Sequence, residues 1–169
     1  MALATKKYEN AILYLCKRQG GALYGKKKLA KLLYYLDFDR YEYKESTKSL
    51  TGDTYKHLPL GPVPDHYMQV VAKLEKTGAI QSDRIEGSNG YEATEVFKSV
   101  QEPDMSVFDK DELYIIDRVS TLYGGLNGTQ LEKLSHAEAP YLATELYEPI
   151  DYQLAFYRGT EFTNAASLA

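Results

Sequence analysis

The segment TGDTYKHLPLGPVPDHYMQVVAKL, residues 51–74, changes character half-way along. Its first half is rich in turn-forming residues, and its second half has the apolar spacing of an amphipathic helix. Gly61-Pro62-Val63-Pro64 separates the two halves. Glycine reaches backbone conformations that other residues avoid, and each proline fixes its own φ and favours an extended residue before it. These four residues therefore predict a rigid bend, with Pro64 in the first turn of the following helix.

Helices are predicted on the N-terminal side of this bend. Residues 6–19 and 26–43 carry apolar side chains at helical spacing, and Gly20-Gly21 ends the first helix. Residues 46–60 contain few helix formers and several Ser, Thr, Gly and Pro residues. They predict a loop with at most one short strand near Thr54.

A β-hairpin and more helices are predicted after the bend. The runs Ile80 to Glu86 and Tyr91 to Phe97 flank Gly87-Ser88-Asn89-Gly90, and Asn-Gly between strand-like runs indicates a hairpin. Asp109 with Glu112 forms an acidic capping box that opens a helix, which ends at Gly124. The predicted fold class is mainly α with a small antiparallel β element, an α+β fold with a helical core and a two-stranded hairpin. Three helices followed by a ribbon is also the order of elements in a winged helix.

Length and composition limit the class of protein. A chain of 169 residues predicts one domain, residues 1–159, followed by a flexible C-terminal tail, residues 160–169. No apolar run reaches the roughly 18 residues of a membrane span, and the N-terminus lacks a signal-peptide core. The single Cys16 forms no internal disulfide. We therefore expect a cytoplasmic protein without membrane contact, and its net charge of −4 argues against a nucleic-acid partner.

The sequence contains no recognisable catalytic or metal-binding motif. His57, His66 and His136 lack the spacing of metal ligands, and neither HExxH nor CxxC occurs. The glycine pairs do not fit a phosphate-binding loop. We therefore predict a protein that is not an enzyme and that has no catalytic residues, no metal and no cofactor.

Three consecutive lysines, Lys26, Lys27 and Lys28, begin the second predicted helix. Positive charges at this end oppose the helix dipole, so the cluster breaks a local rule and indicates a function. In a winged-helix protein these lysines would contact phosphates. The predicted hairpin, however, carries Glu86 and Glu92, and an acidic wing repels DNA. DNA binding therefore remains an alternative to contact with a protein.

The order of several motifs resembles the SocA-like, or Panacea, antitoxin domain. KLAKLLYYLD at residues 28–37 is followed by TGDTY at 51–55 and GPVP at 61–64. Leu134-Ser135-His136, followed by Pro140-Tyr141, is similar to the family's C-terminal signature, in which Trp is common where Tyr141 stands. The resemblance covers roughly residues 8–145. Its motif residues are Thr51, Gly52, Tyr55, Gly61, Pro62, Val63 and Pro64.

The resemblance implies a bacterial or prophage antitoxin of a toxin-antitoxin system, which neutralises its cognate protein toxin by direct protein–protein interaction. An alternative is a proteolytic adaptor that delivers a toxin to a host protease. A winged-helix-like DNA-binding regulator is a further alternative. The 16 tyrosines suit a recognition surface, because tyrosine offers a large apolar area with a polar tip. The candidate partner-binding residues are Lys26, Lys27, Lys28, Tyr34, Tyr35, Asp37, Tyr55 and His57.

Overall fold

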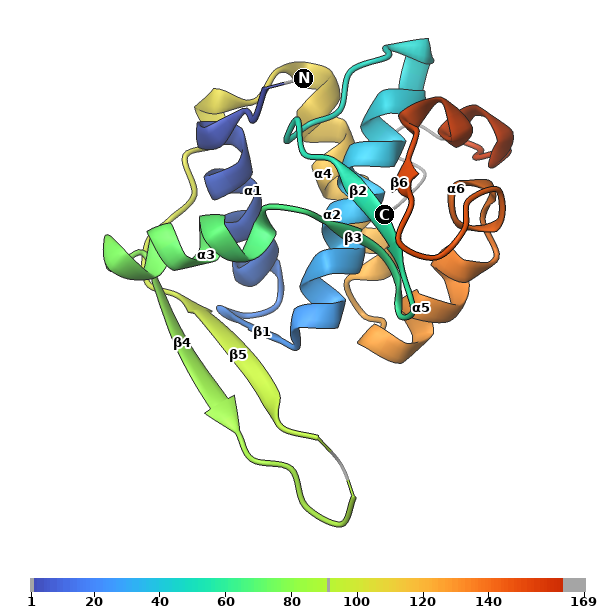
Figure 1. The fold of residues 1–169 in the computed structure, drawn as a ribbon. Helices are drawn as coiled ribbons and strands as arrows, with labels where there is room; N and C mark the ends of the chain where they lie inside the picture. The colour runs from blue at the N-terminus through green and yellow to red at the C-terminus, as the bar shows by residue number, and fades with distance from the viewer. Residues whose placement is uncertain (1, 91, 163–169) are drawn as a thin grey trace.

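The computed structural model describes residues 2–90 and 92–162, and it confirms the α+β class (Figure 1). The helices are α1 (Thr5–Arg18), α2 (Lys26–Glu42), α3 (Tyr67–Lys76), α4 (Lys110–Tyr123), α5 (Gly128–His136) and α6 (Ala139–Leu142). The strands are β1 (Ala22–Tyr24), β2 (Tyr55–Leu58), β3 (Gly61–Pro64), β4 (Ile80–Ile85), β5 (Thr94–Ser99) and β6 (Pro149–Ile150). Short 3-10 helices are η1 (Tyr43–Glu45), η2 (Met105–Val107) and η3 (Tyr152–Tyr157).

Helix α2 is the centre of the fold. It packs against α4, α5, β3 and η3, so that nearly every residue from Leu29 to Tyr41 is buried. The sequence predicted the helix but suggested only one apolar stripe, formed by leucines. The other faces bury aromatic rings, and Phe38 lies between Tyr34 and Tyr152 with ring centroids 4.6 Å apart in each pair.

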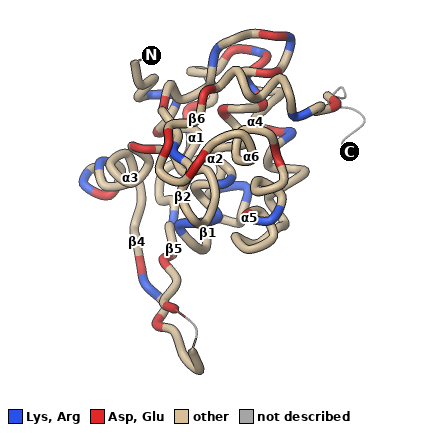
Figure 2. Tube along the Cα trace, turned by 45° about the vertical axis from the view of Figure 1, so that its right-hand side comes forward, with Lys and Arg blue, Asp and Glu red and all other residues tan. Residues whose placement is uncertain are grey.

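The predicted hairpin is confirmed as β4 and β5, and it joins a third strand. The sheet has the order β1-β5-β4 with antiparallel pairing throughout, and Leu23 of β1 lies opposite Phe97 of β5. Strand β1 was not predicted because three residues show no clear periodicity. The hairpin projects from the helical body in Figure 1 and carries both positive and negative residues in Figure 2. The strand order is that of a winged helix, as the order of elements suggested.

The GPVP segment is strand β3. This corrects the predicted bend and the predicted place of Pro64 in the first turn of a helix. Pro64 lies opposite Tyr55 in the β2–β3 pair, and α3 begins only at Tyr67. The short strand predicted near Thr54 in the 46–60 loop is β2, which pairs with β3 on one side and β6 on the other. Strand β3 tolerates its prolines because it lies at the sheet edge, where a missing N–H breaks no ladder.

The start of α4 follows its predicted local signal. Asp109 and Glu112 form the capping box of α4, and each side chain accepts a hydrogen bond from the other residue's backbone N–H. Gly78 follows α3 with φ +81°, as expected for a helix-terminating glycine. Most of the predicted tail, residues 163–169, lies outside the described residues. Within residues 2–90 and 92–162, no helix has the length and apolarity to cross a membrane.

Candidate partner-binding site

The carboxylate of Asp37 organises the TGDTY motif from within the core. It accepts hydrogen bonds from the N–H of Leu50 at 2.9 Å and the N–H of Thr51 at 2.7 Å. It also accepts from Thr51 Oγ1 and Tyr55 Oη, both at 2.6 Å. Burial raises the pKa of Asp37 to about 6, while the donors from Thr51 and Tyr55 oppose this rise. Asp37 therefore fixes the motif to α2.

A second buried carboxylate, Asp53, continues this network. It accepts hydrogen bonds from Tyr8 Oη at 2.6 Å and from the N–H of His66 at 2.9 Å, and its Oδ1 lies 2.7 Å from His66 Nδ1. Gly52 has φ +76°, and a Cβ there would lie 2.2 Å from the carbonyl oxygen of Ala2. The motif thus joins α1, α2 and the start of α3, which is a structural role.

The GPVP strand covers a buried lysine. Lys31 is fully buried, and its Nζ donates a hydrogen bond to the carbonyl oxygen of Pro62 at 3.0 Å. Burial lowers the pKa of Lys31 to about 8. Gly61, with φ +114°, leaves room for this side chain. The predicted bend is therefore a strand whose glycine accommodates a charged group from α2.

Four of the predicted partner-binding residues are not on the surface, and that prediction is wrong for them. Tyr34, Tyr35, Asp37 and Tyr55 are each at most 1 % exposed. Tyr34 Oη donates to Glu138 Oε1 at 2.6 Å, and Tyr35 stacks on another tyrosine, so both rings have partners inside the fold. The apolar stripe of leucines did not predict that α2 is covered on every face.

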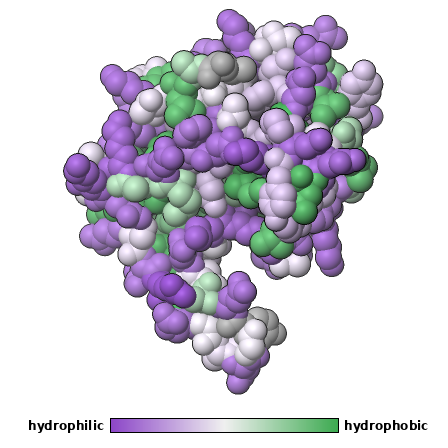
Figure 3. All heavy atoms as spheres, in the orientation of Figure 1, coloured by the Kyte–Doolittle hydropathy of each residue, from purple (hydrophilic) through white to green (hydrophobic). Residues whose placement is uncertain are grey.

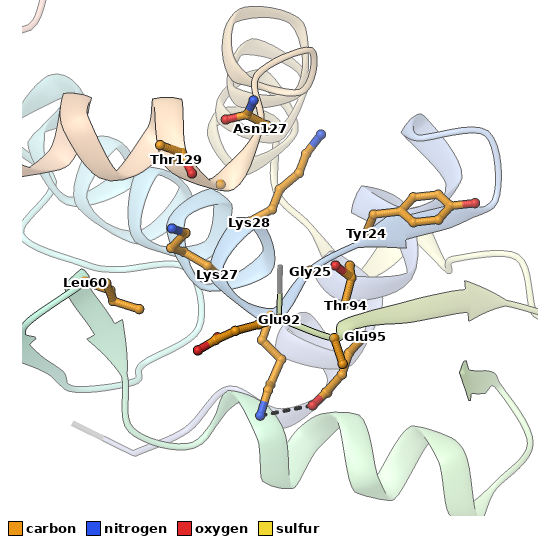
Figure 4. Close-up of a pocket in the computed structure, with 13 residues that line it drawn as sticks. Tyr24, Gly25, Lys27, Lys28, Leu60, Glu92, Thr94, Glu95, Asn127 and Thr129 are labelled. Atoms are coloured by element: carbon orange, nitrogen blue, oxygen red, sulfur yellow. Dashed lines mark ion pairs between the residues drawn. The ribbon is translucent and has the colours of Figure 1, made fainter. Parts of the chain in front are cut away.

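The three lysines predicted to bind a partner, Lys26, Lys27 and Lys28, line a cleft with a volume of about 590 Å³. Its walls are the first turn of α2, the start of α5 at Asn127–Thr129, and the hairpin residues 92–95 (Figure 4). Tyr24 and Leu60, each more than half exposed, also line it.

The lysines of this cleft are already paired. Lys26 lies 3.1 Å from Glu95 and Lys27 lies 3.4 Å from Glu132. Lys28 donates instead to Gln19 Oε1 and to the carbonyl oxygen of Gly124. The cleft is therefore a polar recess with mixed charges and two apolar side chains at its rim.

His57 lies in a stack of three rings that the sequence did not reveal. Its ring centroid is 3.6 Å from that of Tyr141, and His136 stacks on Tyr141 at 4.2 Å. Tyr141 Oη donates to the carbonyl oxygen of Leu58 at 2.8 Å, and His57 Nδ1 lies 2.9 Å from Thr144 Oγ1. Burial lowers the pKa of His136. The family signature around Ser135–Tyr141 marked His136 and Tyr141 in the sequence, but their contact with His57 depends on the tertiary fold.

Nothing in the described part of the chain resembles a metal centre. No group of three or more His, Cys, Asp or Glu side chains in residues 2–90 and 92–162 has the geometry to hold a metal ion. Cys16 is buried in the core, and burial raises the pKa of its thiol to about 12.

A family model described as antitoxin SocA-like, Panacea domain, matches residues 29–141. The chain belongs to this family. The Panacea match begins inside α2 and ends at Tyr141, so it includes the Asp37 network, the GPVP strand and the ring stack. It excludes the three cleft lysines and everything after Tyr141. Comparisons with curated proteins and with solved structures gave no match.

Proposed function

We propose that this protein is the antitoxin of a toxin-antitoxin system and that it neutralises a cognate protein toxin by direct binding. Membership of the SocA-like antitoxin family is the observation that carries this proposal. The protein would act as a binding protein without catalysing a reaction. Occlusion of the toxin's active surface is the simplest mechanism.

The buried motif network supports a role in binding. Asp37 and Asp53 hold the backbone from residue 50 to 66 in one conformation, with every hydrogen bond made inside the protein. A surface that is already ordered loses less conformational entropy when a partner binds. The family motif would therefore act indirectly, because it positions the exposed side chains around it.

Co-expression with the gene adjacent to its own tests this function. The adjacent product alone is expected to stop growth, and this protein is expected to restore it. Co-purification of a stable complex would support neutralisation by sequestration. Loss of the toxin only in cells that contain a host protease would instead support a proteolytic adaptor. A harmless neighbour, or one that stays toxic in the presence of this protein, would contradict the antitoxin function.

DNA binding is a second candidate, and the sheet order β1-β5-β4 with its projecting hairpin favours it. The charges oppose it, since Lys26 is already paired with Glu95 of β5, and Glu86, just beyond the last residue pair of the hairpin, is mostly exposed. Binding to random duplex DNA that weakens steeply with salt would support this candidate. Replacement of Lys26, Lys27 and Lys28 by Glu should then abolish that binding.

A further inference from the structure

The stretch that follows the family match carries many exposed apolar side chains. We call residues 142–157 the C-terminal face. In Figure 3, apolar side chains are visible on the right-hand side of the molecule, where Figure 1 places α6 and β6. The exposed apolar residues of this face are Leu142, Leu146, Tyr147, Phe156 and Tyr157, with exposed fractions from 40 % to 78 %.

The backbone of the C-terminal face is firmly held. Strand β6 pairs with β2. Just before it, the N–H of Tyr147 donates to the carbonyl oxygen of His57 at 2.7 Å, and the N–H of His57 donates to the carbonyl oxygen of Glu148 at 2.9 Å. The exposed side chains therefore stand on a backbone that is ordered before any partner arrives. Such preorganisation reduces the entropy lost on binding.

Tyr147 is an exposed aromatic residue in a strained backbone conformation. Its φ is +70°, a region that non-glycine residues rarely adopt, and its side chain is 64 % exposed. Among the described residues, its ring makes no aromatic contact and its hydroxyl no hydrogen bond. A strained residue with a free, exposed side chain is typical of a binding site, and tyrosine is enriched where proteins meet.

Acidic residues lie between these apolar residues along the C-terminal face. Glu145, Glu148 and Asp151 are exposed, and no Lys or Arg in residues 2–90 and 92–162 lies within 4.0 Å of their carboxylates. The Glu148 carboxylate accepts a hydrogen bond from the N–H of Glu145 at 3.0 Å, and the Asp151 carboxylate accepts one from the N–H of Gln153 at 2.9 Å. The charge complementary to this face is therefore positive.

The size of the face is close to that of a protein interface. With roughly 150–250 Å² for a large side chain, the five apolar residues expose about 450–750 Å². A standard interface covers about 800 Å² on each partner. The apolar residues and the acidic residues around them together reach that scale.

We propose that the C-terminal face binds a basic surface of the partner protein, with Leu142 and Tyr147 as apolar anchors and the three carboxylates facing Lys and Arg side chains. This inference rests on the proposed antitoxin function, and it names the surface and the chemistry of the toxin that it recognises. The face lies outside the Panacea match, and we infer that it determines which toxin is bound.

Binding of two variants to the purified product of the adjacent gene tests the proposal. Leu142→Ser with Tyr147→Asn removes the anchors, and asparagine tolerates the positive φ of position 147. Glu145→Lys with Glu148→Gln reverses the charge and keeps the acceptor of Glu148. Each double variant is expected to raise the Kd at least about tenfold without lowering the melting temperature. The Kd of the unmodified protein should rise between about 0.05 M and about 0.5 M NaCl.

Matched variants on the hairpin, away from the cleft, serve as controls. Glu86→Lys with Asp83→Asn makes the same change of charge, and Ile85→Asn removes an exposed apolar side chain. Both are expected to change the Kd by less than about twofold.

The outcomes separate the two proposals. Suppose that the unmodified protein neutralises the toxin, but that only the control variants change the Kd or that salt does not change it. This result would overturn the assignment of the C-terminal face and leave the antitoxin function intact. A protein that neither binds nor neutralises the adjacent product would overturn both.

Discussion

Gly61 and Lys31 fill adjoining space in the core: a Cβ on Gly61 would lie 2.6 Å from Lys31 Cε and 3.0 Å from its Nζ. The glycine also has φ +114°, which disfavours any side chain at this position. The GPVP motif therefore depends on a residue of α2 that lies thirty positions earlier in the chain. The sequence of the bend alone does not reveal this dependence.

We expect Gly61→Ala to lower the free energy of unfolding by about 3–4 kcal/mol, from the left-handed backbone together with the displaced lysine. Gly78→Ala is the control, because Gly78 also has a positive φ but open space around its Cα. It should lower the free energy by about 1–2 kcal/mol. Urea unfolding measures both. Equal losses in the two variants would show that the Lys31 side chain moves away from the new Cβ without a cost in free energy.

The buried Lys31 predicts a stability that rises in alkaline solution. Its pKa is lowered to about 8 in the folded protein, whereas the unfolded chain titrates near 10.5. The folded state therefore binds fewer protons between these values, and stability increases with pH. From pH 8 to about pH 9.5 the gain relative to Lys31→Met should be about 2 kcal/mol. Denaturant titrations of both proteins measure it, and parallel pH profiles would contradict the prediction.

Tyr55 is expected to contribute to stability through Asp37. Tyr55→Phe removes the hydroxyl that donates to Asp37 at 2.6 Å and should lower the free energy of unfolding by about 1.5–3 kcal/mol. Tyr24→Phe, at an exposed tyrosine, should change it by less than about 0.5 kcal/mol. Thermal and urea unfolding compare the pair. If Tyr55→Phe keeps its stability but no longer binds the partner protein, the stability prediction is wrong and the Tyr55 hydroxyl has a role in binding.

Arg158 joins the segment beyond the family match to the core. It pairs with Asp39, lies 3.8 Å from Glu138, and its guanidinium is 5.8 Å from the ring centroid of Tyr34. Arg158→Met leaves Glu138 without this charge and should lower the free energy of unfolding by about 3–5 kcal/mol. Exposed Arg84 is the control, and Arg84→Met should have almost no effect. An Arg158→Met protein of normal stability would show that this segment is dispensable for folding.

Tyr147→Asn is expected to raise stability, because asparagine adopts the left-handed conformation at lower cost than tyrosine. The gain should be about 1 kcal/mol in the free energy of unfolding, measured by urea denaturation. Tyr157→Asn, at a more exposed tyrosine with ordinary backbone, should give no gain. A loss of stability at position 147 would mean that the ring supports the fold.

Local signals in the sequence predicted most elements. The Asp109–Glu112 capping box, the hairpin around Asn89-Gly90 and the positive φ of Gly61 were all read correctly, because each depends on residues close together in the chain. The strand character of GPVP was missed, because proline usually weakens a strand. Pairing with Tyr55 and Lys56 at a sheet edge outweighs that preference.

The candidate site was predicted less well than the fold. Lys26, Lys27, Lys28 and His57 remain partner-contact proposals, while Tyr34, Tyr35, Asp37 and Tyr55 are buried. The number of tyrosines in a sequence does not tell which rings lie in the core and which lie at the surface. Only the packing of α4, α5 and η3 around α2 decides between these positions.

The sequence by itself determined the α+β class, the main helices, the hairpin and the resemblance to an antitoxin family, since these follow from local periodicity, capping residues and ordered motifs. The tertiary structure decided which motif residues are structural and which surface stays exposed. The Asp37 network, the Gly61–Lys31 fit and the C-terminal face each join residues far apart in the chain. Burial and charge pairing depend on such contacts, and no local pattern specifies them.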